Sequence, residues 1–174
     1  MVIRKALAKD LQAVASVYAD VHTAEENGDL FIGWNRSVYP TIETARLSLE
    51  RDDLFVLENT GEIVGAAIIN QLQMDVYADA NWTYQANDNE VMVLHTLVIS
   101  PKAAGRGFGT SFVKFYEAYA LEHNCPVLRI DTNEINHIAR AIYHKLGYRE
   151  ACIVPCVFNG LKDVNLVLLE KKLI

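Results

Sequence analysis

The sequence contains few cysteines and no pattern of metal ligands. Its three cysteines (Cys125, Cys152 and Cys156) cannot all be paired, and none belongs to a Cys-x-x-Cys motif. This favours buried free thiols over a disulfide framework, a redox pair or a cysteine metal site. The five histidines form no clustered ligand spacing either, so no metal site is expected.

Long apolar runs are absent as well. No stretch approaches the ~18 apolar residues of a membrane-spanning helix. Charged residues interrupt the first ten positions, where a signal peptide would have its apolar core. We therefore expect a cytoplasmic protein with no membrane partner.

Positive charge is in deficit. Sixteen Lys and Arg residues stand against 22 Asp and Glu residues, which gives a net charge of −6. This argues against a nucleic-acid partner, and a polyanionic ligand would need a local positive site. Hydrophobic residues make up 51% and charged residues 22%, as in ordinary globular proteins. The length of 174 residues predicts one domain, residues 1–174, and leaves a homodimer open.

The most informative stretch is residues 93–117, where an apolar run is followed by Pro101, a glycine-dense loop and an amphipathic pattern. The order predicts a buried strand that leads through the loop into a helix. The free amides and dipole at a helix start favour phosphate binding. Gly107 and Gly109 would let a pyrophosphate approach these amides, and Lys102 and Arg106 would add positive charge. On the loop alone, a purely structural turn is an equally good interpretation.

Two other phosphate motifs do not fit this loop. A dinucleotide fingerprint needs a further glycine three residues after the second one, but Gly105 and Gly107 are followed by Thr110. The Gly-Lys-Ser/Thr ending of a P-loop is also missing.

The remaining pattern alternates strands and helices. We expect helices at about residues 9–27, 41–51, 108–123 and 136–146, and strands at about residues 2–5, 54–58, 62–72, 91–100, 127–131, 148–158 and 161–171. Asn159-Gly160 is a strong hairpin signal between the last two strands. Residues 74–90 are polar and irregular, and a loop of this length is more often functional than idle. The elements together indicate an α/β fold.

The late helix, residues 136–146, has two faces. Residues seven apart lie on the same side of a helix. One face carries Asn136, Arg140 and Tyr143 and is expected to be free for a ligand, while the other carries Ile138, Ile142 and Leu146 and is expected to pack. Taken alone, Tyr143 is more simply explained as a half-buried packing residue.

These segments resemble the GNAT superfamily of acyl-CoA N-acyltransferases. Residues 104–109 resemble motif A, Arg/Gln-x-x-Gly-x-Gly/Ala, with Ala104 where the family usually has Arg or Gln. Residues 136–148 resemble motif B, Asn-x-x-Ala-x-x-Leu-Tyr ending in Leu-Gly-Phe, and residues 3–11 resemble the family's opening. The resemblance implies a mixed sheet of six or seven strands, splayed between the fourth and fifth and flanked by about four helices. It also implies acetyl transfer from acetyl-CoA to an amine.

The resemblance further implies which residues hold acetyl-CoA. The pyrophosphate would lie on the amides of residues 106–110, the pantetheine along the strand near Leu97 and Val98, and the sulfur near Tyr143. The implied cofactor residues are Leu97, Val98, Lys102, Gly105, Arg106, Gly107, Gly109, Thr110, Asn136 and Arg140, of which the last two have the least defined role.

Transfer to an amine requires a base and an acid. An alkylamine has a pKa of about 10.4 and must lose a proton before attack, while the departing thiolate needs a proton or a hydrogen bond. Tyr143 is the candidate acid, which the resemblance supports. His95 is the candidate base or water relay, and a histidine here resembles the arylalkylamine N-acetyltransferases. A satisfied core histidine explains His95 equally well.

The acceptor site is expected between residues 25–39 and 74–90, which combine acids such as Asp79 with aromatics. Phe31, Trp34 and Tyr84 are its candidate contacts, and a cationic or aromatic amine would suit them. Acidic loops are also what any acidic protein has. The acceptor can be a small molecule or a peptide amine. A non-catalytic acyl-CoA-binding domain on the same fold is the alternative function.

Overall fold

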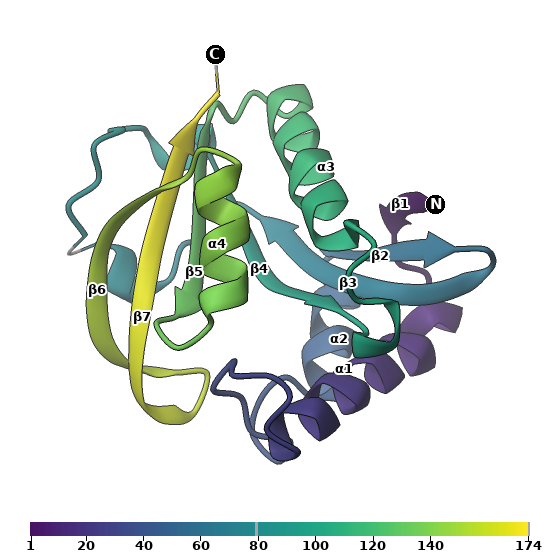
Figure 1. Ribbon diagram of the computed structural model, residues 1–174. Coiled ribbons are helices and arrows are strands. Elements are labelled where there is room, and N and C mark those ends of the chain that lie inside the picture. The colour runs from purple at the N-terminus through teal and green to yellow at the C-terminus, as the bar shows by residue number, and fades with distance from the viewer. Residues whose placement is uncertain (79, 174) are drawn as a thin grey trace.

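A computed structural model describes residues 1–78 and 80–173, and its centre is one seven-stranded sheet (Figure 1). The strands are β1 (Val2–Lys5), β2 (Leu54–Asn59), β3 (Glu62–Asn70), β4 (Val91–Ile99), β5 (Val127–Asn133), β6 (Arg149–Phe158) and β7 (Leu161–Lys172). The helices are α1 (Leu11–Glu26), α2 (Ile42–Glu50), α3 (Phe108–Glu122) and α4 (His137–Lys145). Short 3-10 turns lie at Ala8–Asp10, Asp75–Tyr77, Asp88–Glu90 and Pro101–Ala103.

The sheet opens between β4 and β5. The strand order is β1-β2-β3-β4-β5-β7-β6, and β4 and β5 form its parallel pair. Val91 to Leu94 are in register with Val127 to Ile130, after which β4 continues to Ile99 and β5 to Asn133 without pairing to each other. The predicted mixed sheet, splayed between its fourth and fifth strands and flanked by four helices, is therefore confirmed.

The strands alternate between two hydrophobic layers, because successive side chains point to opposite faces of a sheet. Phe55 and Leu57 pack under α3 and α4, whereas Leu54 and Val56 pack against α1 and α2. Figure 1 shows α3 and α4 on the near face, with α1 and α2 on the far side of β2 and β3. The helix pairs thus cover opposite faces of the sheet.

Residues 74–90 cover the back of the second half of the sheet. Trp82 is buried there, with its Nε1 donating to the carbonyl of Tyr77 at 2.8 Å and its ring 4.2 Å from the Arg129 guanidinium carbon. The buried carboxylate of Glu170 accepts the amides of Thr83 and Tyr84 at 2.8 and 3.1 Å. These contacts fix the irregular segment to β5 and β7, so it closes a core.

Local turns match the sequence prediction. Asn159 and Gly160, between β6 and β7, have φ of 48° and 86°, the left-handed pair that a type I′ hairpin needs. The sequence did not predict that β7 would pair with both β5 and β6. In the described part of the chain, no helix is long and apolar enough to cross a membrane.

Candidate active site

A cavity of about 500 Å³ lies between the unpaired end of β4, the start of α3 and α4. We call it the loop cavity, because residues 103–105 and 107–110 form one of its walls. Seven of the predicted cofactor residues line it, namely Leu97, Val98, Gly105, Gly107, Gly109, Thr110 and Asn136. Phe31, a predicted acceptor contact, also lies at this cavity and is 65% exposed.

The wall of this cavity is built from free amides. Among the described residues, no hydrogen-bond acceptor pairs with the backbone N–H of any residue from 105 to 110, and the first helical hydrogen bond runs from Ser111 to Gly107. Gly105 and Gly107 have φ of 74° and 76°, the left-handed conformation that favours glycine. Amides at a helix start form an anion site, so this loop has the structure expected for a pyrophosphate cradle.

Two of the predicted cationic contacts face a neighbouring groove instead. Lys102 pairs with Asp20 at 2.8 Å, and the Arg106 guanidinium lies 4.8 Å from the centre of the Phe108 ring. Both side chains line a groove of about 610 Å³ between α1 and the β2–β3 hairpin, and neither lines the loop cavity. The cradle therefore consists of backbone amides, with its positive side chains to one side.

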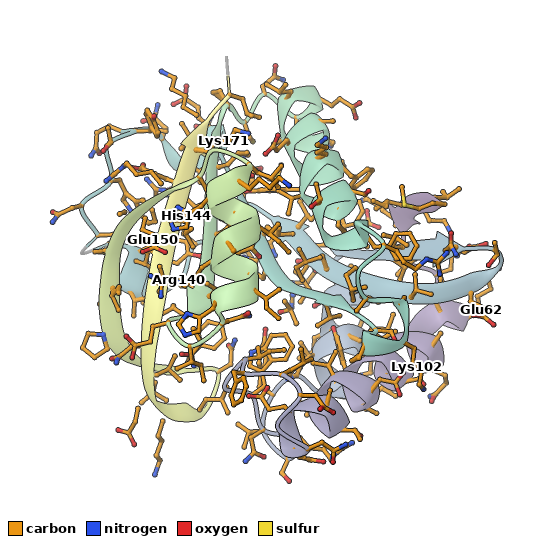
Figure 2. The ribbon with its side chains drawn as sticks, viewed as in Figure 1. Glu62, Lys102, Arg140, His144, Glu150 and Lys171 are labelled. Carbon is orange, nitrogen blue, oxygen red and sulfur yellow. The ribbon has the colours of Figure 1, made fainter. Side chains whose placement is uncertain are left out.

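Arg140 also lies outside the cavity, against expectation. Its guanidinium pairs with Glu150 on β6, with Nε–Oε1 at 2.8 Å, and His144 approaches the same carboxylate at 3.0 Å. Figure 2 shows Arg140 and His144 reaching from α4 toward Glu150. This charge pair holds the pKa of Glu150 below its usual range, chiefly through the hydrogen bond from Arg140. Ile138, which was expected to pack, is exposed and lines the loop cavity. Ile142 packs against the core as expected and also lines this cavity.

Tyr143 stands between two cavities. It lines the loop cavity and also a smaller one of about 50 Å³, which we call the sheet cavity. The side chain is 5% exposed, and burial raises its pKa well above the usual range of a phenol. Its hydroxyl makes no hydrogen bond within the described residues, so it is free to contact a ligand at the junction.

A β-bulge shapes the junction. Ala66 pairs with Val98 but Ile68 pairs with His95, so β4 carries one extra residue against β3. Thr96 lies in the bulge with φ of 51°, and its hydroxyl is hydrogen-bonded to the hydroxyl of Tyr39. The bulge lets the consecutive residues Thr96 and Leu97 both line the sheet cavity.

The sheet cavity has aromatic walls and one carboxylate. Trp34, Tyr39, Tyr143 and Phe158 line it, together with aliphatic residues of β7. The carboxylate is Asp131 of β5, whose pKa is raised by burial. No residue of the irregular segment 74–90 lines this cavity within the described structure, and Asp79 lies outside the described residues. Of the expected acceptor contacts, Trp34 lines this cavity and Tyr84 lies outside it.

His95 lies beside the cavity and not in its wall. Its Nε2 is 3.1 Å from the carbonyl of Leu72 and 3.2 Å from Oδ1 of Asn70, two acceptors, so Nε2 carries the proton of the neutral ring. Burial lowers the pKa of His95, while the charge of Asp131 on the adjacent strand opposes that shift. His95 therefore interacts electrostatically with Asp131 while lying outside the wall of the sheet cavity.

The loop that joins the two cavities is held by a carboxylate. Glu25 Oε1 accepts the amides of Ile32 and Gly33 at 2.9 and 2.6 Å. Gly33 has φ of 82° and packs directly on the side chain of Asn133, which any Cβ would overlap. This contact brings the loop from α1 against the end of β5 and closes the sheet cavity.

Gly33→Ala should lower the free energy of unfolding by about 2 to 3 kcal/mol, because it combines left-handed strain with a steric overlap. Gly28→Ala is the matched control, since Gly28 has φ of 78° but nothing within 4 Å of an added Cβ. It should cost about 1 kcal/mol. Urea denaturation of both variants measures the difference, and equal losses would show that the contact with Asn133 contributes nothing.

Residues 14–148 match the acetyltransferase (GNAT) family. The chain belongs to the GNAT family. It is therefore an acetyl-CoA-dependent N-acetyltransferase, as the two motifs predicted. An uncharacterized N-acetyltransferase of Methanocaldococcus jannaschii is 25% identical over 173 residues, which cover 98% of this chain and 92% of that protein.

Solved GNAT structures share the fold. An acetyltransferase of the GNAT family from Streptococcus agalactiae 2603 superposes with a TM-score of 0.77 at 20% identity, covering 98% of this chain and 94% of that one. The ribosomal-protein-alanine N-acetyltransferase of Brucella melitensis gives 0.73 at 20% identity, with 99% and 100% covered. The Salmonella typhimurium protein yncA, solved with its cofactor acetyl-CoA, gives 0.70 at 19% identity, with 100% and 94% covered.

Within this GNAT enzyme, Asp131 is the site residue that sequence reasoning missed. The signal was present, since an acidic residue follows the apolar run of β5 and ligands gather beyond the carboxyl ends of parallel strands. The sequence prediction had instead placed the acceptor site between residues 25–39 and 74–90. Among the described residues, no group of three or more His, Cys, Asp or Glu side chains is placed to hold a metal ion.

Proposed function

We propose that this enzyme moves the acetyl group of acetyl-CoA to a primary amine by direct attack on the thioester. The observation that carries the proposal is the position of Tyr143, which borders both the loop cavity and the sheet cavity. A donor in the first cavity and an acceptor in the second would meet at its hydroxyl. Holding two reactants in such a geometry is a large part of catalysis of group transfer.

The loop cavity suits acetyl-CoA. The free amides of residues 105–110 would bind the pyrophosphate, with their alignment at the start of α3 favouring its negative charge. The end of β4, which has no partner strand beyond Leu94 on the β5 side, would hold the pantetheine near Leu97 and Val98. The thioester would then lie toward the bulge and Tyr143.

A covalent acyl-enzyme is not part of the proposal. Cys125 is fully buried and burial raises the pKa of its thiol, while Cys152 and Cys156 line neither cavity. The hydroxyl of Thr96 is engaged by Tyr39. No metal is needed for any step.

Two measurements test the function against the alternative of a non-catalytic binding domain. Calorimetry should give saturable binding of acetyl-CoA, and a panel of small-molecule and peptide amines should release free CoA thiol. Binding without thiol release across the panel would favour the non-catalytic domain. Release of thiol at a rate that does not depend on the amine would indicate hydrolysis of the thioester instead of transfer.

His95 is proposed to relay the amine's proton. Because burial lowers its pKa, the neutral ring should form at a pH below the reference value of about 6.5. The rate at saturating acetyl-CoA should then rise with pH through an ionisation below 6.5, and His95→Asn should flatten this limb. His123→Asn, on the exposed end of α3, is the control and should keep it.

A core histidine would behave differently. A lowered pKa in the folded state means that the unfolded chain takes up its proton first, so stability is full above about pH 6.5 and falls as the pH drops through the folded pKa. His95→Asn would then remove the contribution of His95 to the acid sensitivity of stability and leave the shape of the rate profile unchanged. That outcome would end the relay assignment.

A further inference from the structure

Asp131 presents one free oxygen to the sheet cavity. Tyr77 is fully buried and donates its hydroxyl to Oδ2 of Asp131 at 2.6 Å. Within the described residues, Oδ1 has no hydrogen-bond partner. Asp131 is half-buried and lines this cavity, and Oδ1 is not one of the fully buried polar atoms without a partner. Oδ1 is therefore open to the cavity and can accept a hydrogen bond from a donor that enters it.

The walls around Asp131 restrict what that donor can be. Tyr39 packs edge-on against Trp34 and against Phe158, with ring centres 5.9 and 5.6 Å apart. The enclosed volume of about 50 Å³ has room for roughly three to five non-hydrogen atoms, given 10 to 15 Å³ for one water. The end of an unbranched chain fits this space.

The lining contains one anion and no cation. Apart from Asp131, no charged side chain lines the cavity in the described part of the protein, and its lysines, arginines and histidines all lie elsewhere. A ligand carboxylate would be taken out of water beside Asp131 with no positive partner, which is strongly unfavourable. A positively charged hydrogen-bond donor is favoured, because Asp131 would be its partner of opposite charge.

We propose that the acceptor of this acetyltransferase is an unbranched primary ammonium group, R–CH₂–NH₃⁺ with no carboxylate on the amine-bearing carbon, held by Oδ1 of Asp131. The inference rests on the proposed function and names its substrate class. Both a free alkylamine and a lysine side chain carry this group. An α-amino acid does not, because it has a carboxylate on the amine-bearing carbon. A protein N-terminus other than glycine does not, because its amine-bearing carbon is branched.

Asp131 can also accept the proton that the amine must lose. The groups that face it are the hydroxyls of Tyr77, Tyr39 and Tyr143, the ring of His95 and the thiol of Cys156. All are neutral near pH 7, so no cation holds the carboxylate in its charged form, and burial raises its pKa. An ammonium N–H bond breaks as the Oδ1–H bond forms, and the neutral amine attacks the thioester carbonyl. The C–S bond then breaks, the amine loses its second proton to water, and the departing thiolate takes up a proton to become free thiol. The Oδ1 proton leaves to water after the product, with His95 as the proposed relay.

Three amines separate size from charge at the amine-bearing carbon. 1-Aminobutane has two hydrogens there, 2-aminopentane replaces one by a methyl group, and norvaline replaces it by a carboxylate. We expect kcat/KM to fall at least 10-fold from the first to the second and at least 10²-fold from the first to the third. Nα-acetyl-lysine amide serves as the side-chain form of the substrate, and an alanine-starting peptide as the branched form. Preference for norvaline or for the alanine peptide would overturn the inference.

Asp131→Asn tests whether Asp131 holds the ammonium group. Asp163→Asn is the control, because Asp163 is an exposed aspartate near the start of β7. Asp131→Asn should weaken binding of 1-aminobutane in calorimetry at least 10-fold and leave the affinity for acetyl-CoA unchanged. The control should alter neither. Equal binding of 1-aminobutane to the wild type and Asp131→Asn would sink the assignment.

The binding measurement separates this inference from the proposed function. If 1-aminobutane binds in an Asp131-dependent manner but no amine releases thiol, the transferase proposal fails and the ammonium site stands. If norvaline is acetylated well and 1-aminobutane neither binds nor reacts, the transferase proposal stands and the ammonium site fails.

Discussion

Tyr143→Phe should lower turnover by roughly 10²-fold while the affinity for acetyl-CoA stays unchanged, which is the loss expected when a positioned proton donor is removed. The ring remains and keeps its packing, but the free hydroxyl at the junction of the two cavities is lost. Steady-state kinetics and calorimetry measure the two quantities. A parallel loss of affinity would mean that Tyr143 only holds the cofactor.

Tyr148→Phe is the matched control. Its ring centre is 5.9 Å from that of Tyr143, and its hydroxyl is buried without a hydrogen-bond partner in the described structure. Tyr148 lines neither cavity. Removing this hydroxyl should leave turnover unchanged, because it relieves an unpaired polar group and touches no ligand. If both variants lost turnover equally, the effect would be one of packing.

The high pKa of Tyr143 limits its role. The reference values of about 10 for a phenol and about 8.5 for a thiol already make full proton transfer to the thiolate uphill by about 2 kcal/mol. Burial, with a smaller effect from the charge of Asp131, raises the pKa of the Tyr143 phenol further. A hydrogen bond to the departing sulfur is therefore the expected contribution, and the proton itself can come from solvent.

Gly109→Asp should reduce the affinity for acetyl-CoA by at least 10²-fold without unfolding the protein. Gly109 lies in the first turn of α3 with an ordinary φ, and an added Cβ would meet only Ile142 Cδ1, at 3.7 Å. The carboxylate would then stand beside the pyrophosphate. Two unit charges about 4 Å apart repel by about 4 kcal/mol at an effective dielectric constant of 20.

Gly109→Ala separates the charge from the size of the side chain. Alanine suits a helix better than glycine and meets the same single contact, so cofactor affinity should change little. The aspartate should not lower the thermal midpoint either, because an acidic residue in the first turn suits the helix dipole. Unchanged affinity in Gly109→Asp would remove the amide cradle from the proposed site.

Local patterns carried most of the fold prediction. Apolar periodicity and turn residues located the strands and helices, since these signals depend on neighbours in sequence. These local signals could not predict that β7 lies between β5 and β6, because pairing between distant segments depends on the whole sheet. The contact of the irregular segment with the sheet was unpredictable for the same reason, since Glu170, which accepts from the amides of Thr83 and Tyr84, lies 87 and 86 residues further along the chain.

The site was predictable where it rests on backbone geometry. The amides of residues 105–110 follow from glycine spacing, and the motif resemblance placed Tyr143 near them. The partners of individual side chains were harder to predict from the sequence. The face of Arg140 was inferred from helical periodicity, but its direction is decided by Glu150 on another element. Asp131 became a candidate only when the structure placed it in the sheet cavity.

On the two sides of the opening between β4 and β5, different segments of the chain line the two cavities. The loop cavity, the proposed donor site, is lined by β4 and the start of α3. Much of the wall of the sheet cavity, the proposed acceptor site, comes from the β6–β7 hairpin through Phe158, Leu161 and Val164. The two strands at the opening share only the short register from Val91 to Leu94. Substitutions in the hairpin can therefore reshape the sheet cavity, the proposed acceptor site, without touching the proposed cofactor cradle.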